Sequence, residues 1–320
     1  MGSFVLEFEK PIIELEKKID EMKAYAADEN VELSDEIRRL EGRLENLMKD
    51  TYAKLSRWQR YQLAKHPERP YTLDYVERMF TDFVELHGDR QFADDPAVVC
   101  GLAQLDGRPV MIVGQQKGRT MKQKLHRNFG MMNPEGYRKA IRIMKMAAKF
   151  KRPIVVFVDT MGAYPGLGAE ERGQGEAIAR NIFEMSHLSV PILIVIIGEG
   201  ASGGALGIGV GDRVLMMENG WYSVISPEGC AAILWRDSAK ADLAAEALKL
   251  TAPDLIELGV IDEIIPEPLG GAHRDFDAAA ANVKGRIVHH LNELMPLDGA
   301  TLVERRIEKY GRIGFYEEKK

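Results

Sequence analysis

The chain has 320 residues, of which 45% are hydrophobic and 29% charged, and its formal net charge at pH 7 is −6. This length can bury a full globular core, and the acidic balance gives no reason to expect nucleic acid as a partner. No apolar run approaches the length needed to cross a membrane, and residues 1–10 lack the apolar core of a signal peptide, so we expect a cytoplasmic protein.

Residues 5–60 differ in composition from the rest of the chain, being rich in Glu, Lys and Leu and poor in glycine. Apolar residues recur every three or four positions over 12–26 and over 33–47, with a break at 28–32, so we predict a helical hairpin. Two heptads in each arm are too few for an independent coiled coil. The hairpin must therefore pack on the rest of this chain or on a second subunit.

Two prolines in the segment 66–70 mark the clearest boundary in the sequence. We divide the chain there into an N-terminal helical unit, 1–65, and a larger domain, 66–320. The larger domain begins with a predicted helix at 73–86. Asp106-Gly107 between two β-rich runs then predicts a β-hairpin.

A basic loop follows this hairpin and carries three candidate ligands for an anion, Lys117, Arg119 and Arg127. So many cations beside a strand end suit an anionic ligand, although a solvated loop would explain them as well. The two cysteines, Cys100 and Cys230, form no Cys-x-x-Cys pair, which excludes a disulfide framework and a cysteine zinc site. We predict no metal on this chain and expect both thiols in the core.

Two units of strand, glycine turn and helix come next. The strand 153–158 leads to Gly162, Ala163, Tyr164 and Pro165, and a predicted helix 169–187 precedes the strand 192–197. Apolar runs without alternation are typical of strands that are covered on both faces. Repeated β-β-α units with functional turns at the strand ends favour an α/β architecture coiled on itself.

The turn after residue 197 allows three interpretations. Gly198-x-Gly200-x-x-Gly203 matches a dinucleotide fingerprint, but the glycines that follow make a short, poor helix. Ser202 fits a nucleophile elbow, but no downstream histidine stands in a suitable context to be its base. In the third interpretation the backbone N–H groups of Gly203 and Gly204 form an oxyanion hole, and Ser202 caps the helix.

Seven motifs occur in the following order: Phe8-Glu9-Lys10-Pro11-Ile12, Glu85-Leu86-His87-Gly88-Asp89-Arg90, Gln116-Lys117-Gly118-Arg119, Arg127-Asn128-Phe129-Gly130, Gly162-Ala163-Tyr164-Pro165-Gly166 with Glu170-Glu171-Arg172-Gly173-Gln174, Ser202-Gly203-Gly204-Ala205-Leu206, and Tyr222-Ser223-Val224-Ile225-Ser226-Pro227-Glu228-Gly229. Together they resemble the carboxyltransferase α subunits of bacterial acetyl-CoA carboxylases, over nearly the whole chain. The sequence departs from that family at Met161, Gln115 and Ala201, where proline, histidine and glycine are common.

The resemblance implies a crotonase-like (ClpP/crotonase) spiral of β-β-α units, with 66–320 as a CoA carboxyltransferase domain of the C-terminal type. It also implies transfer of a carboxyl group from carboxybiotin to acetyl-CoA, giving malonyl-CoA in the first committed step of fatty acid synthesis. Biotin's ureido group, once it has lost the carboxyl group, can take the acetyl proton, so the protein must supply fixed N–H donors rather than a strong base. Gly203 and Gly204 would be those donors, Arg127 would bind the carboxylate, and Tyr164 and Pro165 would wall the biotin pocket.

The resemblance further implies partners. These are a zinc-ribbon β subunit that holds acetyl-CoA, a biotin carboxyl carrier protein, and a biotin carboxylase that brings ATP binding to the complex. An α2β2 assembly is expected, with activity only when the β subunit is present. The alternative is a self-sufficient crotonase-like acyl-CoA hydratase or isomerase, and a non-enzymatic scaffold comes third.

Overall fold

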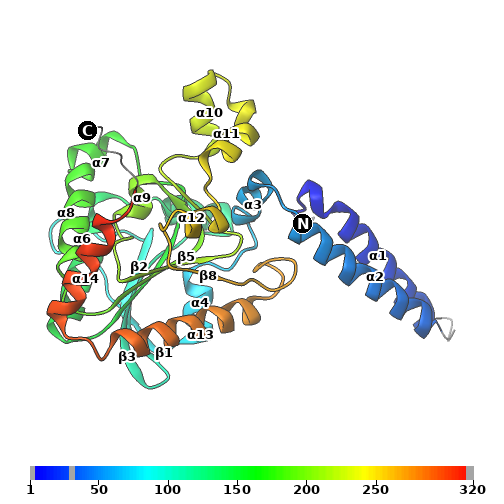
Figure 1. The fold of residues 1–320 in the computed structure, drawn as a ribbon, viewed down its shortest axis with the longest axis horizontal. Coiled ribbons are helices and arrows are strands. Elements are labelled where there is room, and N and C mark those ends of the chain that lie inside the picture. Colours follow the sequence, from blue (N-terminus) through cyan, green and yellow to red (C-terminus); the bar gives the residue numbers. More distant parts are fainter. Residues whose placement is uncertain (1–3, 29–32, 315–320) are drawn as a thin grey trace, which may run out of the picture.

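The computed structural model describes residues 4–28 and 33–314, and its strands form one mixed sheet (Figure 1). The strands are β1 (Thr81–Glu85), β2 (Val98–Leu105), β3 (Arg108–Gln115), β4 (Ile154–Thr160), β5 (Ile192–Ala201), β6 (Arg213–Met217), β7 (Trp221–Ser223) and β8 (Glu263–Ile265). Their order is β1-β2-β3-β4-β5-β6-β8, and β7 pairs with β5. The first three strands are antiparallel and the remaining pairs are parallel, as crossover helices require.

The α-helices are α1 (Lys10–Asp28), α2 (Ser34–Ala53), α3 (Arg57–Ala64), α4 (Thr72–Met79), α5 (Met121–His126), α6 (Pro134–Lys149), α7 (Leu167–Glu171), α8 (Gln174–Ser186), α9 (Ser202–Leu206), α10 (Pro227–Trp235), α11 (Ala241–Leu248), α12 (Ala252–Glu257), α13 (Phe276–Leu294) and α14 (Gly299–Gly311). Short 3-10 turns add Glu7–Glu9, Asn128–Gly130 and Ser238–Lys240. None of these helices combines the length and apolarity needed to cross a membrane within the described residues.

Strand β5 lies in the middle of the sheet and is buried along its whole length. Ile192, Ile194 and Ile196 pack toward α6 and α8, whereas Leu193 and Val195 pack toward α4 and α13. Side chains alternate between the two faces of a strand, so a strand covered by helices on both faces needs an unbroken apolar run. The prediction of a doubly covered strand is therefore confirmed.

Strand β5 is longer than its apolar run, because it continues through residues 198–201. Its first part pairs with β6 at 193–196, and its last part pairs with β7 at 199–201. Strand β5 thus has one pairing partner along its first part and another along its last part. Of the glycines that follow the apolar run, Gly198 and Gly200 lie in the strand, Gly203 and Gly204 lie in α9, and the later ones follow that helix.

The structure corrects several sequence-based boundaries. The predicted helix 73–86 ends at Met79, and its second half forms β1, which pairs with β2. The predicted helix 169–187 is broken at Gly173, whose φ of 80° a helix cannot continue. The β-hairpin at Asp106-Gly107 is confirmed, with positive φ at both residues.

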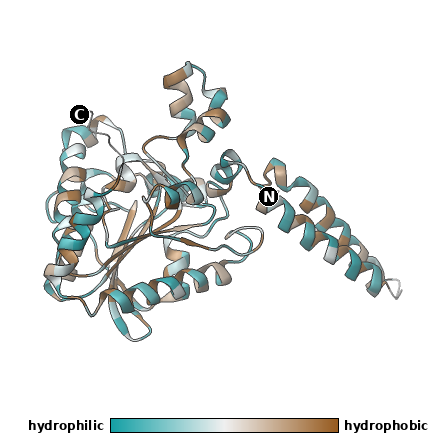
Figure 2. Ribbon diagram, viewed as in Figure 1, coloured by the Kyte–Doolittle hydropathy of each residue, from teal (hydrophilic) through white to brown (hydrophobic). Residues whose placement is uncertain are grey.

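The helical hairpin of α1 and α2 projects from the body, and its ribbon is largely hydrophilic with scattered hydrophobic positions (Figures 1 and 2). Ile12 and Ile19 are buried in α1, and Met48 is buried in α2. The base of the hairpin is anchored by an ion pair of 2.5 Å between Arg274 and Glu16. The two arms contact each other, and the ion pair holds the base of the hairpin on the rest of this chain, which is one of the two surfaces that the sequence allowed. The predicted break at 28–32 falls mostly on residues 29–32, which lie outside the described residues.

Helix α3 lies within the predicted N-terminal unit but packs on the body. Arg57 at its start forms ion pairs with Asp254 (2.5 Å) and Glu246 (2.7 Å), and Tyr61 packs against Trp221. Because α3 contacts the body, the projecting hairpin consists only of the part of the chain that precedes α3.

Helices α10 and α11 form a small lobe that stands out from the body (Figure 1). Its own core holds few side chains, Cys230, Ala231 and Ala244 among them. Ile233 and Leu234 remain 72% and 62% exposed, so the lobe presents apolar side chains on its surface. Cys100 and Cys230 are both buried free thiols, as the sequence predicted.

Candidate active site

Two glycine turns meet where β4 and β5 end. The strands are parallel neighbours, with Thr160 opposite Gly200, so the segments that follow them lie at the same edge of the sheet. Gly204 packs directly on the first turn, because a Cβ at Gly204 would lie 2.5 Å from the nitrogen of Ala163. Gly162 has a φ of 148°, and a Cβ there would meet no atom within 4 Å. The two turns are therefore in contact at Gly204, whereas the space in front of the Gly162 α-carbon is open.

Helix α9 begins at Ser202, with Ala201 as its N-cap and no capping side chain. The prediction that Ser202 caps this helix is wrong. Ser202 is instead exposed and has a φ of 53°, the left-handed region that L-residues rarely adopt. The first N–H groups of a helix have no acceptor within that helix. Those of Gly203 and Gly204 therefore need an acceptor from outside the helix.

A buried ion triad lies beneath the turns. The ammonium of Lys117 is 2.6 Å from Asp159 and 2.5 Å from Glu199, and all three side chains are largely shielded from water. Burial alone would lower the pKa of Lys117, but the charges of Asp159 and Glu199 raise it overall. Lys117 stays charged and joins the segment after β3 to β4 and β5.

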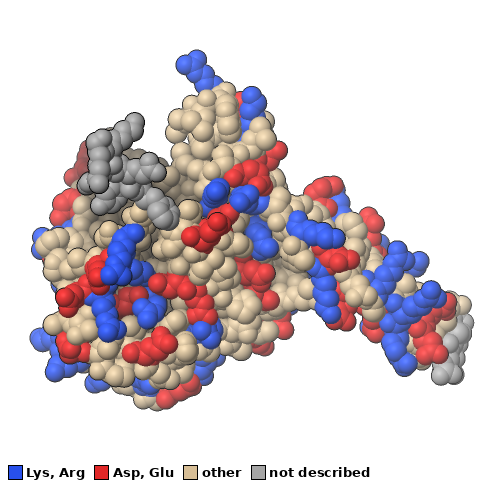
Figure 3. Space-filling model, viewed as in Figure 1, with Lys and Arg blue, Asp and Glu red and all other residues tan. Residues whose placement is uncertain are grey.

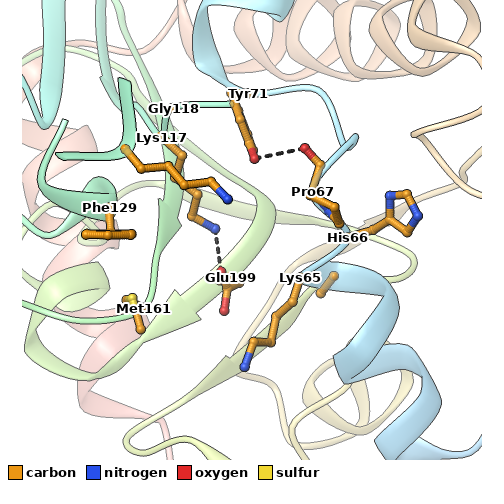
Figure 4. Close-up of a pocket in the computed structure, with 11 residues that line it drawn as sticks. Lys65, His66, Pro67, Tyr71, Lys117, Gly118, Phe129, Met161 and Glu199 are labelled. Atoms are coloured by element: carbon orange, nitrogen blue, oxygen red, sulfur yellow. Dashed lines mark hydrogen bonds and ion pairs between the residues drawn. The ribbon is translucent and has the colours of Figure 1, made fainter. Parts of the chain in front are cut away.

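Lys117 and Glu199 line a pocket of about 140 Å³ (Figure 4). In this view Lys117 and Glu199 point toward each other, and Phe129, Met161 and Tyr71 lie around them. The remaining lining residues are Ala64, Lys65, His66, Pro67, Gly118 and Lys124. The pocket thus opens beside the ion triad, with apolar walls and lysines at its rim.

The other predicted cations lie apart from the glycine turns. Arg119 pairs with Asp74 at 2.6 Å and stacks on the ring of Tyr71 at 4.7 Å. Arg127 donates to the carbonyl of Pro96 at 2.8 Å, and no carboxylate of the described residues forms an ion pair with it. Arg119 and Arg127 both line a second pocket, of about 210 Å³. The structure brings these two together but shows no contact between them and Gly203 or Gly204.

Tyr164 and Pro165 lie in the turn after β4. The backbone N–H of Tyr164 donates to the carbonyl of Met132 at 3.1 Å. The Tyr164 ring covers Gly166, where a Cβ would lie 2.4 Å from the ring, so a side chain at this position would have to displace the ring. Pro165 is exposed. Both residues belong to the turn that Gly204 packs on.

Sequence reasoning did not place Gln115, Asp159 and Glu199 at the candidate site. Each is a buried polar residue at or near the end of one of three adjacent strands, β3, β4 and β5. The signal was present in the sequence, because a polar residue that follows a run of buried apolar residues at the carboxyl end of a parallel strand is a candidate site residue. Gln115 was noted only as a departure from a family pattern.

Among the residues that the structure describes, two groups of side chains lie close enough together to hold a metal ion: Glu9 with His66 and His273, and His289 with His290 and Glu293. In the first group the two ring nitrogens of His66 already face Phe4 O (3.3 Å) and Glu68 N (3.2 Å). This ring is held by the protein itself, so the geometry favours a hydrogen-bonded cluster over a metal site.

Residues 5–314 match the family model described as acetyl co-enzyme A carboxylase carboxyltransferase-like. A protein of Geobacter metallireducens named acetyl-coenzyme A carboxylase carboxyl transferase subunit alpha is 60% identical over 317 residues, which cover 99% of each chain. A relative of the same name from a Geobacillus species is 60% identical over 97% of this chain and 95% of its own.

Solved structures share the fold at much lower identity. The transcarboxylase 12S structure matches with a TM-score of 0.58 and 20% identity over 71% of this chain and 42% of its own. The β subunit of Pseudomonas aeruginosa geranyl-CoA carboxylase matches with a TM-score of 0.55 and 15% identity over 79% of this chain and 46% of its own. This chain therefore spans less than half of these two proteins. The likeness confirms the predicted crotonase-like α/β fold.

Proposed function

The chain belongs to the acetyl-coenzyme A carboxylase carboxyltransferase family, and on that premise we propose that it moves a carboxyl group from carboxybiotin to acetyl-CoA, giving malonyl-CoA for fatty acid synthesis. The observation that carries the proposal is the 60% identity over 99% of both chains with a relative named as the α subunit of this carboxyl transferase. The alternative, a self-sufficient hydratase or isomerase, draws no support from the names of these relatives.

Carboxybiotin, when bound, supplies the carboxyl group and a ureido nitrogen that can afterwards take the acetyl proton. The residues of this chain fit such a group, because a Cβ at Gly162 would meet only open space beside the N–H groups of α9. We assign the N–H groups of Gly203 and Gly204 to the ureido oxygen, where fixed donors stabilise a developing negative charge. The contact between Gly204 and the Gly162-Ala163 turn holds these donors in place.

Among the predicted cations, Arg127 is the one we assign to the transferred carboxylate. Lys117 and Arg119 already hold carboxylates of this chain, whereas the Arg127 guanidinium has only a carbonyl partner in the described structure. A guanidinium can bind a carboxylate through two parallel hydrogen bonds. Tyr164 and Pro165 are assigned to the wall of the biotin pocket.

We further propose that this chain supplies half of an active site. The other half would come from a zinc-ribbon β subunit that holds acetyl-CoA, in an α2β2 assembly that a biotin carboxyl carrier protein and a biotin carboxylase serve. The word "subunit" in the names of the relatives supports a multisubunit complex.

The test is reconstitution. The purified chain is incubated with carboxybiotin and acetyl-CoA, alone and with a co-expressed β subunit, and malonyl-CoA is measured. We expect product only in the second mixture. Malonyl-CoA from the chain alone would overturn the half-site proposal, and hydration of an enoyl-CoA by the chain alone would favour the alternative.

A further inference from the structure

Gln115 ends β3 and is fully buried between the two site segments. Its side-chain nitrogen donates to the carbonyl of Gly204 at 2.8 Å, and its side-chain oxygen accepts from the backbone N–H of Asp159 at 3.0 Å. One amide therefore connects the end of β4 with the first turn of α9. Its own backbone carbonyl accepts from the hydroxyl of Thr72 at 2.6 Å, which fixes the strand end from behind.

The two partners of Gln115 make opposite demands. The carbonyl of Gly204 can only accept a hydrogen bond, and the backbone N–H of Asp159 can only donate one. An amide meets both demands without carrying a charge, which suits a site closed to water. The Tyr137 hydroxyl also donates to Gly204 O, but at 3.4 Å, so Gln115 makes the shorter bond.

We propose that Gln115 is a positioning residue for carboxyl transfer, which holds Gly204 so that its N–H group faces the developing oxyanion. The inference rests on the function proposed above, in which that N–H group is an oxyanion donor. The side chain does not touch substrate. It acts by fixing the carbonyl of the residue whose N–H group is the donor, and the backbone contact with Gly162 fixes the same residue from the other side.

The first variant is Gln115→Leu in the reconstituted complex. Leucine is close to glutamine in size but offers neither donor nor acceptor, so Gly204 loses its anchor. A displacement of about 1 Å at a reacting group can cost about 10²-fold in rate. We expect kcat to fall by roughly that factor, with the KM for acetyl-CoA close to wild type.

Gln115→Glu and Gln115→His separate positioning from simple space filling. A protonated glutamic acid can donate to Gly204 O and accept from Asp159 N–H, but an ionised carboxylate can only accept. Burial raises the pKa of such a carboxyl group, so kcat relative to wild type should fall as pH rises. A neutral imidazole also offers one donor and one acceptor, whereas its protonated form has no acceptor. For Gln115→His, relative kcat should therefore fall as pH is lowered.

The nearby charged groups, Lys117 after β3, Asp159 in β4 and Glu199 in β5, are present in every variant, so the ratio to wild type removes their own pH dependence. Thermal melting and co-elution with the β subunit identify variants that fail to fold. Opposite pH slopes for Gln115→Glu and Gln115→His support the proposal even if Gln115→Leu does not fold. Profiles parallel to wild type for both variants would overturn it. An inactive wild-type complex would overturn the proposed function instead.

Discussion

Gly204 cannot carry a side chain beside Gly162, because its Cβ would lie 2.3 Å from the Gly162 carbonyl carbon. The two turns are therefore held together backbone to backbone. Any substitution at Gly204 must push the turns apart rather than merely crowd the open space in front of them. The two segments can approach this closely only because residue 204 has no Cβ.

Gly204→Ala tests this contact. We expect the variant to fold with a loss of about 1–3 kcal/mol, as overpacked positions do, and to lose kcat by about 10²–10³-fold, the cost of one misplaced oxyanion donor. Activity in the reconstituted complex and denaturant unfolding measure the two effects. Gly175→Ala is the matched control, since a Cβ there meets nothing within 4 Å and activity should stay at the wild-type level. Wild-type kcat for a folded Gly204→Ala would contradict the assignment of this donor.

Lys117→Met tests the ion triad. The substitution keeps an unbranched chain but leaves the carboxylates of Asp159 and Glu199 buried without their cation. Breaking a buried pair in this way costs about 3–5 kcal/mol, and denaturant unfolding measures the loss. Lys124→Met is the control, because Lys124 lines the same pocket and forms no ion pair with the described residues. Equal stability of the two variants would show that the triad contributes little.

His66 should make stability depend on pH. Burial, and next the charge of His273, lower the pKa of His66 from 6.5 to about 4. The unfolded chain therefore binds the proton more tightly between these values, and the free energy of unfolding falls as pH drops from 6.5 toward 4. The full contribution, roughly 3 kcal/mol, is present above pH 6.5.

His66→Gln is the comparison for this prediction. Glutamine can donate to Phe4 O and accept from Glu68 N–H, as the histidine ring does, but it does not titrate. Unfolding measured at pH 7 and pH 5 should show a larger drop for wild type than for the variant. Parallel curves would mean that folding leaves the pKa of His66 unchanged, and they would contradict this prediction.

Ser202 has the backbone conformation of a nucleophile elbow without a base. Its φ of 53° matches the strained turn of such serines, yet no histidine of the described residues forms a hydrogen bond with it. Ser202→Gly should keep wild-type kcat, since glycine adopts positive φ without strain. A nucleophile would lose several orders of magnitude of rate. Labelling of Ser202 by a fluorophosphonate probe would contradict this prediction.

The sheet and most of its helices could be predicted because local patterns specify them. The unbroken apolar run of β5 required burial on both faces, and Asp106-Gly107 required a tight turn. The run Thr81–Glu85 could not be assigned in this way. Its short pattern follows a helix without a break, and only pairing with β2 makes it a strand. Tertiary contacts override local preference at such positions.

Local patterns account for only part of the candidate site. The glycine motifs drew attention to Gly204, where close backbone approach requires glycine, and to Gly162, where a φ of 148° requires it. The capping role of Ser202 was wrong, because a motif does not reveal the φ of the residue that begins the helix. The bonds of Gln115 join residues 44 and 89 positions away, and no local rule describes contacts at that distance in sequence.

The apolar lobe of α10 and α11 bears on how much of this chain a cell can tolerate. Ile233 and Leu234 of this lobe are each more than 60% exposed, and most of the lobe is uncharged on the face that Figure 3 shows. Exposed apolar surface of this kind tends to associate. We expect copies of the chain whose lobe is uncovered to associate through it as their concentration rises. A cell that made the chain together with a partner covering the lobe would keep that concentration low.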